Sequence, residues 1–427
     1  MTDVFSLGDF KMPEGFLWGS STAGHQIEGN NIHSDRWFDE LEREQTEPDF
    51  QASGEACRHY ELYKHDIDLL KELGHQAFRM SVEWSRIEPE QGHFDEKEVK
   101  HYLDELEYLK SNNIQVFITL VHFSMPKWFR DLGGFEKIEN LKYFQNYLNF
   151  IVPKIAPYTD FWNTLNETNH PRFASRLKAN NLKYHARAYH IIKAYSNAPV
   201  SIAHAFHLYM PKRMFDKFDT ALTEQYDCMV NEYFLHAIRT GEVVLPGIDG
   251  VFDREIKDTC DYWALNWYTR DMIDARDPKT ISAKYRHNEL KLISQPSYFD
   301  EFFAEGMTDV LMRLKDKPIY ITENGCCADD DRFRIIYMAQ VLSAIRESID
   351  FGADVKGFLY WSLMDNYEWY SFVPRFGMVD VDYNTYKRTP KKSAYFFKDM
   401  IERNGFSQEI LRKYLKELPS IGLGKQV

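Results

Sequence analysis

In the stretch Phe161-Trp-Asn-Thr-Leu165, strand-forming residues are followed at once by two polar residues, Asn166 and Glu167. Short runs of aromatic and β-branched residues that end in a polar group are typical of buried strands. Similar runs recur along the chain. The eight strands predicted in this way are Phe16–Gly19, Ala77–Ser81, Val116–Leu120, Phe161–Leu165, Val200–Ala203, Tyr262–Trp267, Ile319–Thr322 and Phe358–Trp361.

Longer stretches between these runs have helical periodicity. Between the first two strands, apolar residues such as Tyr63, Ile67 and Leu70 fall three or four positions apart, and Gly74 is placed to end the helix. Comparable patterns cover Val99–Leu109, Tyr143–Ile155, Tyr184–Tyr195, Val310–Leu314 and Ile335–Ile349. Eight strands that alternate with helices in 427 residues predict a (β/α)8 TIM barrel with loop insertions.

The domain organisation follows from the absence of any Pro-, Gly- or Ser-rich linker. We expect a single domain over 1–427, with a core at about 12–405 and a C-terminal tail at 406–427. A doubly wound open sheet is the rival architecture. It loses support as a nucleotide-binding fold because the early glycines, such as Gly15 and Gly19, fit neither of the two common phosphate-binding motifs.

Composition excludes several classes of protein. Apolar residues make up 44% and charged residues 27%, which rules out intrinsic disorder. The formal charge of −13 disfavours unselective binding to nucleic acid or to an anionic membrane. No apolar run approaches the roughly 18 residues of a membrane span, and the start of the chain lacks a signal-peptide pattern. Five scattered cysteines without metal-ligand spacing fit free thiols in the cytoplasm and predict no metal site.

Reactive side chains finish or follow the predicted strands. Because the C-terminal ends of barrel strands meet at one mouth, we expect these side chains to converge there. They include Arg79, His122, Asn166, Glu167, Asn266, Tyr268, Glu323, Asn324 and Trp361. The set contains two carboxylates, Glu167 and Glu323, although a carboxylate at a strand end is also a common structural residue.

A pair of carboxylates is what the cleavage of a glycosidic bond requires. One must be protonated to donate to the leaving oxygen, and the other must be ionised to stabilise or capture the positive charge on the anomeric carbon. The two hold different pKa values only if their surroundings differ. We expect Arg79 and the Tyr268 hydroxyl to keep Glu323 anionic, which leaves Glu167 as the proton donor.

Local sequence around these residues resembles glycoside hydrolase family 1, the retaining β-glucosidase and β-glycosidase family. The similar segments are Phe16–Gly29, Phe78–Pro89, Thr119–Trp128, Trp162–Thr168, Leu265–Thr269, Ile319–Gly325 and Trp361–Trp369. The resemblance implies that Glu167 is the acid/base and Glu323 the nucleophile, supported by Arg79, Asn166 and Tyr268. It also implies a set of sugar-binding residues, namely Gln26, His122, Asn166, Trp361, Glu368 and Trp369, and it implies no cofactor or metal.

The same resemblance implies a substrate class. Relatives that act on 6-phosphorylated sugars usually replace the pair Glu368-Trp369, which this chain keeps, so a small unphosphorylated β-glycoside or oligosaccharide is expected, with glucose as the favoured terminal sugar. Preference among gluco, galacto and fuco configurations stays open. Retention predicts carboxyl groups about 5 to 5.5 Å apart. Two alternatives remain, a transglycosidase that uses the same intermediate and a non-catalytic sugar-binding relative; the oligomeric state is also open.

Three positions depart from the family pattern. His25 stands where Tyr is usual, Trp267 where Tyr is common, and Thr168 where Pro normally follows the acid/base. The usual Gly- and Pro-rich loop after the acid/base is missing, because residues 169–183 run directly into a helical pattern, and the segment between Trp267 and Ile319 looks shortened. Both loops normally wall the aglycone side, so we expect a wider or differently shaped entrance there.

Overall fold

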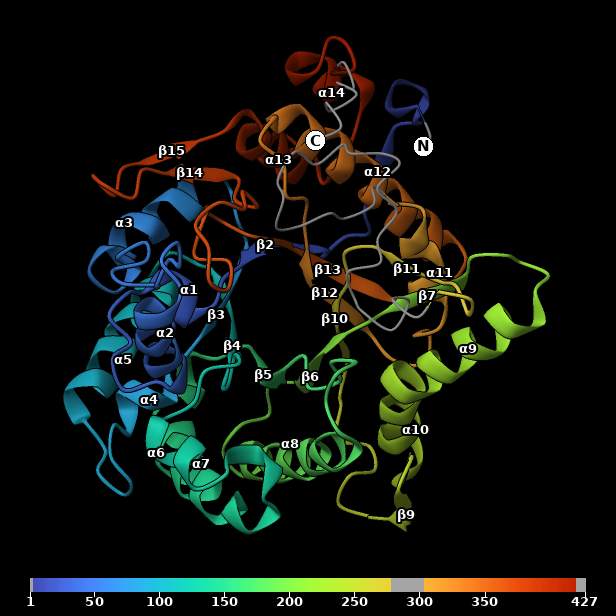
Figure 1. The fold of residues 1–427 in the computed structure, drawn as a ribbon. Coiled ribbons are helices and arrows are strands. Elements are labelled where there is room, and N and C mark those ends of the chain that lie inside the picture. The colour runs from blue at the N-terminus through green and yellow to red at the C-terminus, as the bar shows by residue number, and fades with distance from the viewer. Residues whose placement is uncertain (1–2, 278–302, 420–427) are drawn as a thin grey trace.

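The structure is a computed structural model that describes residues 3–277 and 303–419. Eight parallel strands close into a barrel around which the helices are arranged (Figure 1). In order around the barrel the strands are β2 (Leu17–Ser21), β3 (Ala77–Ser81), β4 (Gln115–Thr119), β5 (Phe161–Asn166), β6 (Val200–Ala205), β10 (Trp263–Asn266), β12 (Ile319–Asn324) and β13 (Val355–Trp361). The predicted (β/α)8 barrel is therefore confirmed.

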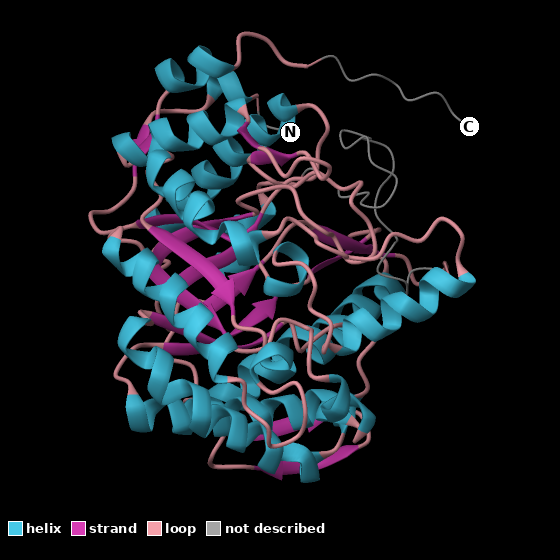
Figure 2. Ribbon diagram, turned by 90° about the vertical axis from the view of Figure 1, so that its left-hand side faces the viewer, coloured by secondary structure: helices cyan, strands magenta, loops and turns pink. Residues whose placement is uncertain are grey.

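Helices that follow the strands form the outer layer, which Figure 2 shows packed against the barrel. They are α3 (His59–Glu72), α5 (Glu96–Ser111), α7 (Leu141–Ile155), α8 (Ser175–Tyr195), α10 (Tyr233–Thr240), α11 (Gly306–Met312), α12 (Asp331–Asp350) and α13 (Lys392–Arg403). Local sequence explains where these helices begin and which residues they bury. In α5, for example, the Asp95 carboxylate caps the first turn by accepting from the amides of Lys97 and Glu98, while Leu106 and Leu109 are buried.

Further elements elaborate the loops. The additional α-helices are α1 (Gly24–Ile27), α2 (Asp35–Thr46), α4 (Trp84–Ile87), α6 (Lys127–Asp131), α9 (Lys217–Asp227) and α14 (Gln408–Tyr414). A π-helical turn, η5 (Cys228–Glu232), joins α9 to α10, and short 3-10 turns are η1 (Val4–Ser6), η2 (Gly134–Glu136), η3 (Ile138–Asn140) and η4 (Ala156–Tyr158). Two-stranded ribbons pair β7 (Leu208–Pro211) with β11 (Arg270–Ile273), β8 (Glu242–Leu245) with β9 (Ile248–Phe252), and β14 (Val379–Val381) with β15 (Arg388–Pro390).

The two ends of the described chain meet. β1 (Phe10–Lys11) pairs antiparallel with β16 (Gly405–Phe406), and Phe10 stacks on Phe406 with ring centroids 5.5 Å apart. After β16, α14 packs on α13 and α12, and its Leu411 is fully buried. Residues up to Leu415 therefore continue the packed body past 405, where the sequence placed the start of a tail.

Aromatic and small side chains fill the N-terminal part of the barrel interior. Phe117 stacks on Phe161 with ring centroids 4.2 Å apart, and Tyr262 and Leu359 complete this interior cluster with the small residues Ala77, Ala203 and Ala264. This interior cluster closes the N-terminal end of the barrel. Polar side chains further along the strands therefore lie at the opposite, C-terminal end, which forms the mouth. No helix within residues 3–277 and 303–419 is both long and apolar enough to cross a membrane.

Candidate active site

The two carboxylates singled out by sequence line one pocket at the C-terminal mouth. Glu323 lies within β12, and Glu167 follows β5 with a left-handed backbone, φ 50°. A non-glycine residue holds this conformation at a cost that the surrounding fold must offset, and such residues cluster at functional sites. The cavity has a volume of about 360 Å³. Its lining includes Gln26, His122, Asn266, Tyr268, Trp361, Glu368 and Trp369 in addition to the two carboxylates.

Positive charge and hydrogen-bond donors surround Glu323. The fully buried Arg79 guanidinium donates from Nη1 to Oε1 of Glu323, and the Tyr268 hydroxyl donates to Oε2 at 2.8 Å. Arg79 is itself fixed, because Nε donates to Thr119 Oγ1 at 3.0 Å and Nη2 to Asn166 Oδ1 at 2.6 Å. Both carboxylate oxygens of Glu323 therefore accept a bond, one of them from a guanidinium.

The surroundings of Glu167 differ, because burial and a neighbouring negative charge dominate there. The pKa of Glu167 is raised from 4.5 to about 8, chiefly because burial disfavours its charged form and secondly because Glu323 is negative. A hydrogen bond from Asn266 Nδ2 to Oε1, 3.0 Å long, and the charge of Arg79 act against this rise. At neutral pH Glu167 therefore holds a proton.

A third carboxylate, Glu368, lies at the other end of the pocket. Trp361 Nε1 donates to Glu368 Oε1 at 3.0 Å, and Gln26 Nε2 donates to Oε2 at 3.3 Å. Burial raises the pKa of Glu368 to about 8, with a smaller rise from Glu323. A protonated or ionised carboxyl held in this way can bond to vicinal hydroxyl groups of a ligand.

Three buried polar atoms of residues in the pocket lining have no partner within the described chain. They are Oε1 of Gln26, Nε1 of Trp267 and Nδ1 of His122, whose Nε2 lies 3.2 Å from Asn166 Nδ2. Burial and the nearby Arg79 lower the pKa of His122 well below its usual value, so the ring is neutral. Because buried polar groups are normally satisfied, these atoms indicate that a polar ligand completes the pocket.

Aromatic rings form one wall of the pocket at the end where Glu368 lies. The planes of His25 and Trp369 stack at 7° with centroids 6.1 Å apart, and His122 lies at 16° to Trp369 on centroids 6.3 Å apart. His25 is held by Glu40, which faces its Nε2 at 2.9 Å. The residue that replaces the usual Tyr is thus a support for Trp369.

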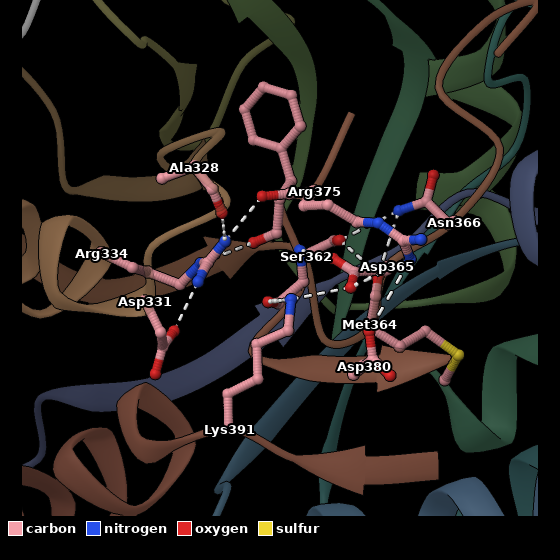
Figure 3. Close-up of polar contacts among 12 residues, drawn as sticks. Ala328, Asp331, Arg334, Ser362, Met364, Asp365, Asn366, Arg375, Asp380 and Lys391 are labelled. Atoms are coloured by element: carbon pink, nitrogen blue, oxygen red, sulfur yellow. Dashed lines mark hydrogen bonds and ion pairs between the residues drawn. The ribbon is translucent and has the colours of Figure 1, made fainter. Parts of the chain in front are cut away.

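The loop that follows Trp361, the last residue of β13, carries Glu368 and Trp369 and is held in place by buried polar contacts. Figure 3 shows Lys391 and Arg375 directed toward the buried Asp365. Asp365 accepts from Lys391 Nζ at 2.7 Å and from the Gly377 amide at 2.8 Å, while Arg375 Nη1 lies 3.4 Å away. This network holds the loop against β14 and α13.

All ten site residues proposed from sequence therefore fall in the pocket lining or bond directly to it. Sequence reasoning did not single out several other lining residues, among them Phe123, His170, His207 and Asp271. All four lie outside the barrel strands, and their spacing carried no signal. Among the departures, Trp267 is 1% exposed and lines the pocket, while the segment that looked shortened includes residues 278–302, which lie outside the described residues.

Comparisons with known proteins agree with this geometry. The family model for glycosyl hydrolase family 1 matches residues 9–179 and 173–406. A 1,4-beta-D-glucan glucohydrolase of Thermotoga neapolitana is 28% identical over 93% of this chain and 99% of its own length, and beta-glucosidase A of Acetivibrio thermocellus is 28% identical over 92% and 99%. The structure of a beta-glycosidase from Pyrococcus horikoshii superposes with a TM-score of 0.84 at 32% identity, covering 97% of this chain and 100% of that one. The chain belongs to glycosyl hydrolase family 1.

Proposed function

We propose that the protein is a retaining β-glycosidase that removes a terminal, non-reducing β-D-glycosyl unit, with glucose as the preferred sugar. The observation that carries the proposal is one pocket with two carboxylates in opposite environments. Glu323 is bonded by a guanidinium and a phenol, whereas burial raises the pKa of Glu167 to about 8. Retaining hydrolysis needs this division between an anion and an acid.

In the proposed reaction, Glu323 attacks the anomeric carbon while Glu167 gives its proton to the leaving oxygen. The bond to the aglycone breaks, and a covalent glycosyl ester forms on Glu323. Glu323 is then neutral, so the negative charge that raised the pKa of Glu167 is gone, and Glu167 can act as a base toward water. Water attacks the anomeric carbon, the ester bond breaks, and both groups return to their first state.

The polar end of the pocket supports a hexose without a phosphate group. Glu368, Gln26 and His122 offer hydrogen-bond partners for neighbouring hydroxyls, and no Lys or Arg is among the described residues of the lining to pair with a phosphate dianion. Trp361 and Trp369 supply flat apolar surface for the faces of a pyranose ring. The relatives named as beta-glucosidases support glucose as the sugar.

Initial rates on p-nitrophenyl β-glycosides of glucose, galactose, fucose, mannose and 6-phosphoglucose test the proposal, with Glu323→Gln as the blank. We expect glucose or fucose to lead and the blank to be inactive although folded. A slow 2-deoxy-2-fluoroglucoside should add one glycosyl mass to Glu323, because fluorine next to the anomeric carbon slows breakdown of the ester. Proton NMR should show the β-anomer of the released sugar first; the α-anomer first would mean inversion and overturn the mechanism.

Three further predictions stay proposals. We propose one domain, because the family match runs from 9 to 406. All five cysteines are free thiols, which supports a reducing compartment such as the cytoplasm. We also propose a homo-oligomer, because large barrels often pair through exposed helices, and light scattering tests this.

A further inference from the structure

The loop that carries Glu368 and Trp369 has two consecutive residues with a strained backbone. Trp369 has φ 41° and Tyr370 has φ 82°, in the left-handed region that residues with a side chain seldom adopt. Within the loop, the Trp369 amide donates to Tyr367 O at 3.1 Å and the Glu368 amide to Ser371 O at 2.9 Å. The indole nitrogen of Trp369 makes no hydrogen bond with the described residues. Contacts from outside the loop must therefore offset the strain and fix the direction of the indole ring.

Helix α2 supplies one of these contacts directly. The guanidinium carbon of Arg36 lies 5.7 Å from the centroid of the Trp369 ring, which is a cation–π distance. The same side chain donates from Nη1 to the Tyr370 hydroxyl at 3.1 Å. Arg36 therefore contacts both residues whose backbone is strained.

A second contact comes from α2 through His25, whose ring is parallel to that of Trp369, at 7° with centroids 6.1 Å apart. Glu40 lies four positions after Arg36 and so on the same face of α2, and its Oε1 is 2.9 Å from His25 Nε2. Asn31 Nδ2 approaches the other ring nitrogen, Nδ1, as a donor at 3.4 Å, so Nε2 is the nitrogen that donates to Glu40. Both ring nitrogens of His25 are thus held.

The contacts of α2 with the rest of the barrel do not depend on the loop that carries Trp369. The Asp35 amide donates to Met125 O and the Asp35 carboxylate accepts from the Met125 amide, each at 2.8 Å. At Glu40, Oε2 accepts from the Ser53 amide at 2.9 Å. α2 is therefore a fixed support against which the indole ring can be positioned.

Glu368, the neighbour of Trp369, is held in another way. Trp361 and Gln26 bond directly to its carboxyl group. Within the described chain, no residue of α2 bonds to this carboxyl. The two consecutive sugar-binding residues are thus positioned by separate parts of the protein, and a change in α2 acts on the indole ring first.

We propose that Arg36 and the Glu40–His25 pair are positioning residues for Trp369, and that they set the affinity of the enzyme for its terminal sugar. The proposal rests on the proposed function, in which Trp369 offers a flat surface to the pyranose ring. None of the three positioning residues lines the sugar pocket, so each acts through Trp369 rather than on the substrate. Their loss should weaken sugar binding more than it slows bond cleavage, because the two carboxylates that carry the reaction keep their own partners.

Two variants test the proposal, each by removing one contact. Arg36→Met removes the guanidinium from the indole ring, and His25→Phe keeps a flat ring but loses the bond to Glu40. Arg43→Met is the matched control, because Arg43 is on the same helix but its guanidinium carbon lies over Tyr370, 4.3 Å from the ring centroid, rather than over Trp369.

Affinity for the sugar is measured as the Ki of phenyl 1-thio-β-glucoside, which resists hydrolysis, together with KM and kcat on p-nitrophenyl β-glucoside. We expect Ki and KM to rise about two- to fivefold in Arg36→Met and in His25→Phe, the range for one lost cation–π or similar ring contact. The change in kcat should be smaller. Arg43→Met should match the wild type, and Arg36→Lys, which keeps a positive charge near the ring, should recover part of the affinity.

A double-mutant cycle separates positioning through Trp369 from a general structural effect. In a Trp369→Ala background, Arg36→Met and His25→Phe should add no further change in Ki, because the ring on which they act is gone. Full effects in that background, or a wild-type Ki in both single variants, would overturn the proposal. If His25→Phe does not fold, Arg36→Met alone decides each comparison.

A wild type that neither cleaves the p-nitrophenyl glucoside nor binds the thioglucoside would overturn the proposed function instead. Hydrogen exchange of the backbone amides of residues 367–372 then decides the positioning role. Faster exchange in folded Arg36→Met and His25→Phe than in the wild type and Arg43→Met supports it. Equal exchange in all four proteins overturns it.

Discussion

The side-chain amide of Asn266 donates to Glu167 Oε1 at 3.0 Å, and the same nitrogen donates to Asn166 Oδ1 at 3.1 Å. Asn166 in turn accepts from Arg79, which bonds to Glu323. The Asn266 amide thus bonds both to the proposed acid, Glu167, and to Asn166, which is linked through Arg79 to the proposed nucleophile, Glu323. It opposes the rise in the pKa of Glu167 that burial and the charge of Glu323 produce.

The pH profile of kcat/KM should therefore lose activity as the pH rises through about 8. Below this pH, Glu167 in the free enzyme holds the proton that the leaving oxygen needs, and above it the proton is gone. Rates on p-cresyl β-glucoside, a poor leaving group, measure this limb. β-Glucosyl fluoride needs little proton donation, so its alkaline limb should be weaker. The same limb on both substrates would assign the pKa to another group.

Asn266→Ala should move this alkaline limb upward by about 0.5 to 1 pH unit, because a donor to the carboxylate lowers its pKa and the variant removes that donor. The rate below pH 7 should also fall, since Asn166 and Thr322 lose a partner in Asn266. The matched control is Thr322→Val, which removes the 2.7 Å bond to Asn266 Oδ1 but leaves its amide nitrogen in place. A downward shift in Asn266→Ala would contradict the assigned hydrogen bond.

The sequence predicted the barrel because each strand has a distinct apolar run, and β3 occupies Ala77–Ser81 as expected. Strand ends were less predictable. β12 extends to Asn324 and β13 begins at Val355, three residues before the predicted Phe358. Register shifts between these strands place the extra residues in the ladder, and such bulges depend on the partner strand rather than on local composition.

Site residues on strands were predictable for the same reason, whereas loop residues were not. Glu323 lies on β12 and Arg79 on β3, and their side chains bond at the mouth of the barrel, so the strand pattern was enough to bring them together. Phe123 and His25 reach the site through loops and a short helix, and their roles depend on contacts with Trp369. The cavity of about 410 Å³ lined by Val121, Phe123 and Leu177 could not be predicted at all, because it is a space between elements rather than a residue pattern.

Glu368→Gln should stabilise the fold, and the gain should grow with pH. The pKa of Glu368 is about 8 in the folded protein and near 4.5 when unfolded, so between these values the unfolded chain releases a proton that the folded one retains. Fewer protons bound in the unfolded state means that unfolding becomes easier as the pH rises. A Gln side chain does not ionise and so does not lose stability in this way. Thermal melts should show a free energy of unfolding about 1 to 3 kcal/mol higher in Glu368→Gln than in the wild type at pH 8, and little difference at pH 5. A gain that is equal at both pH values would show that the carboxyl ionises freely in the fold.

Asp365→Ala should weaken both the fold and sugar binding. The substitution leaves Lys391 and the Gly377 amide without their shared acceptor, and removing one partner of a buried ion pair costs about 3 to 5 kcal/mol. The loop that follows Trp361 and carries Glu368 then loses its contacts with Lys391 and Gly377, so KM should rise more than kcat falls (Figure 3).

Arg375→Ala is the matched control for this network. Its side chain lies 3.4 Å from Asp365 and is 31% exposed, so its loss should cost no more than about 1 kcal/mol, and the carbonyl contact to Arg334 is retained because it belongs to the backbone. Thermal melts and Michaelis–Menten analysis of both variants separate the two effects. If Asp365→Ala lowered kcat alone and left KM and the melting temperature as in Arg375→Ala, Asp365 would influence the reaction through charge rather than by holding the loop.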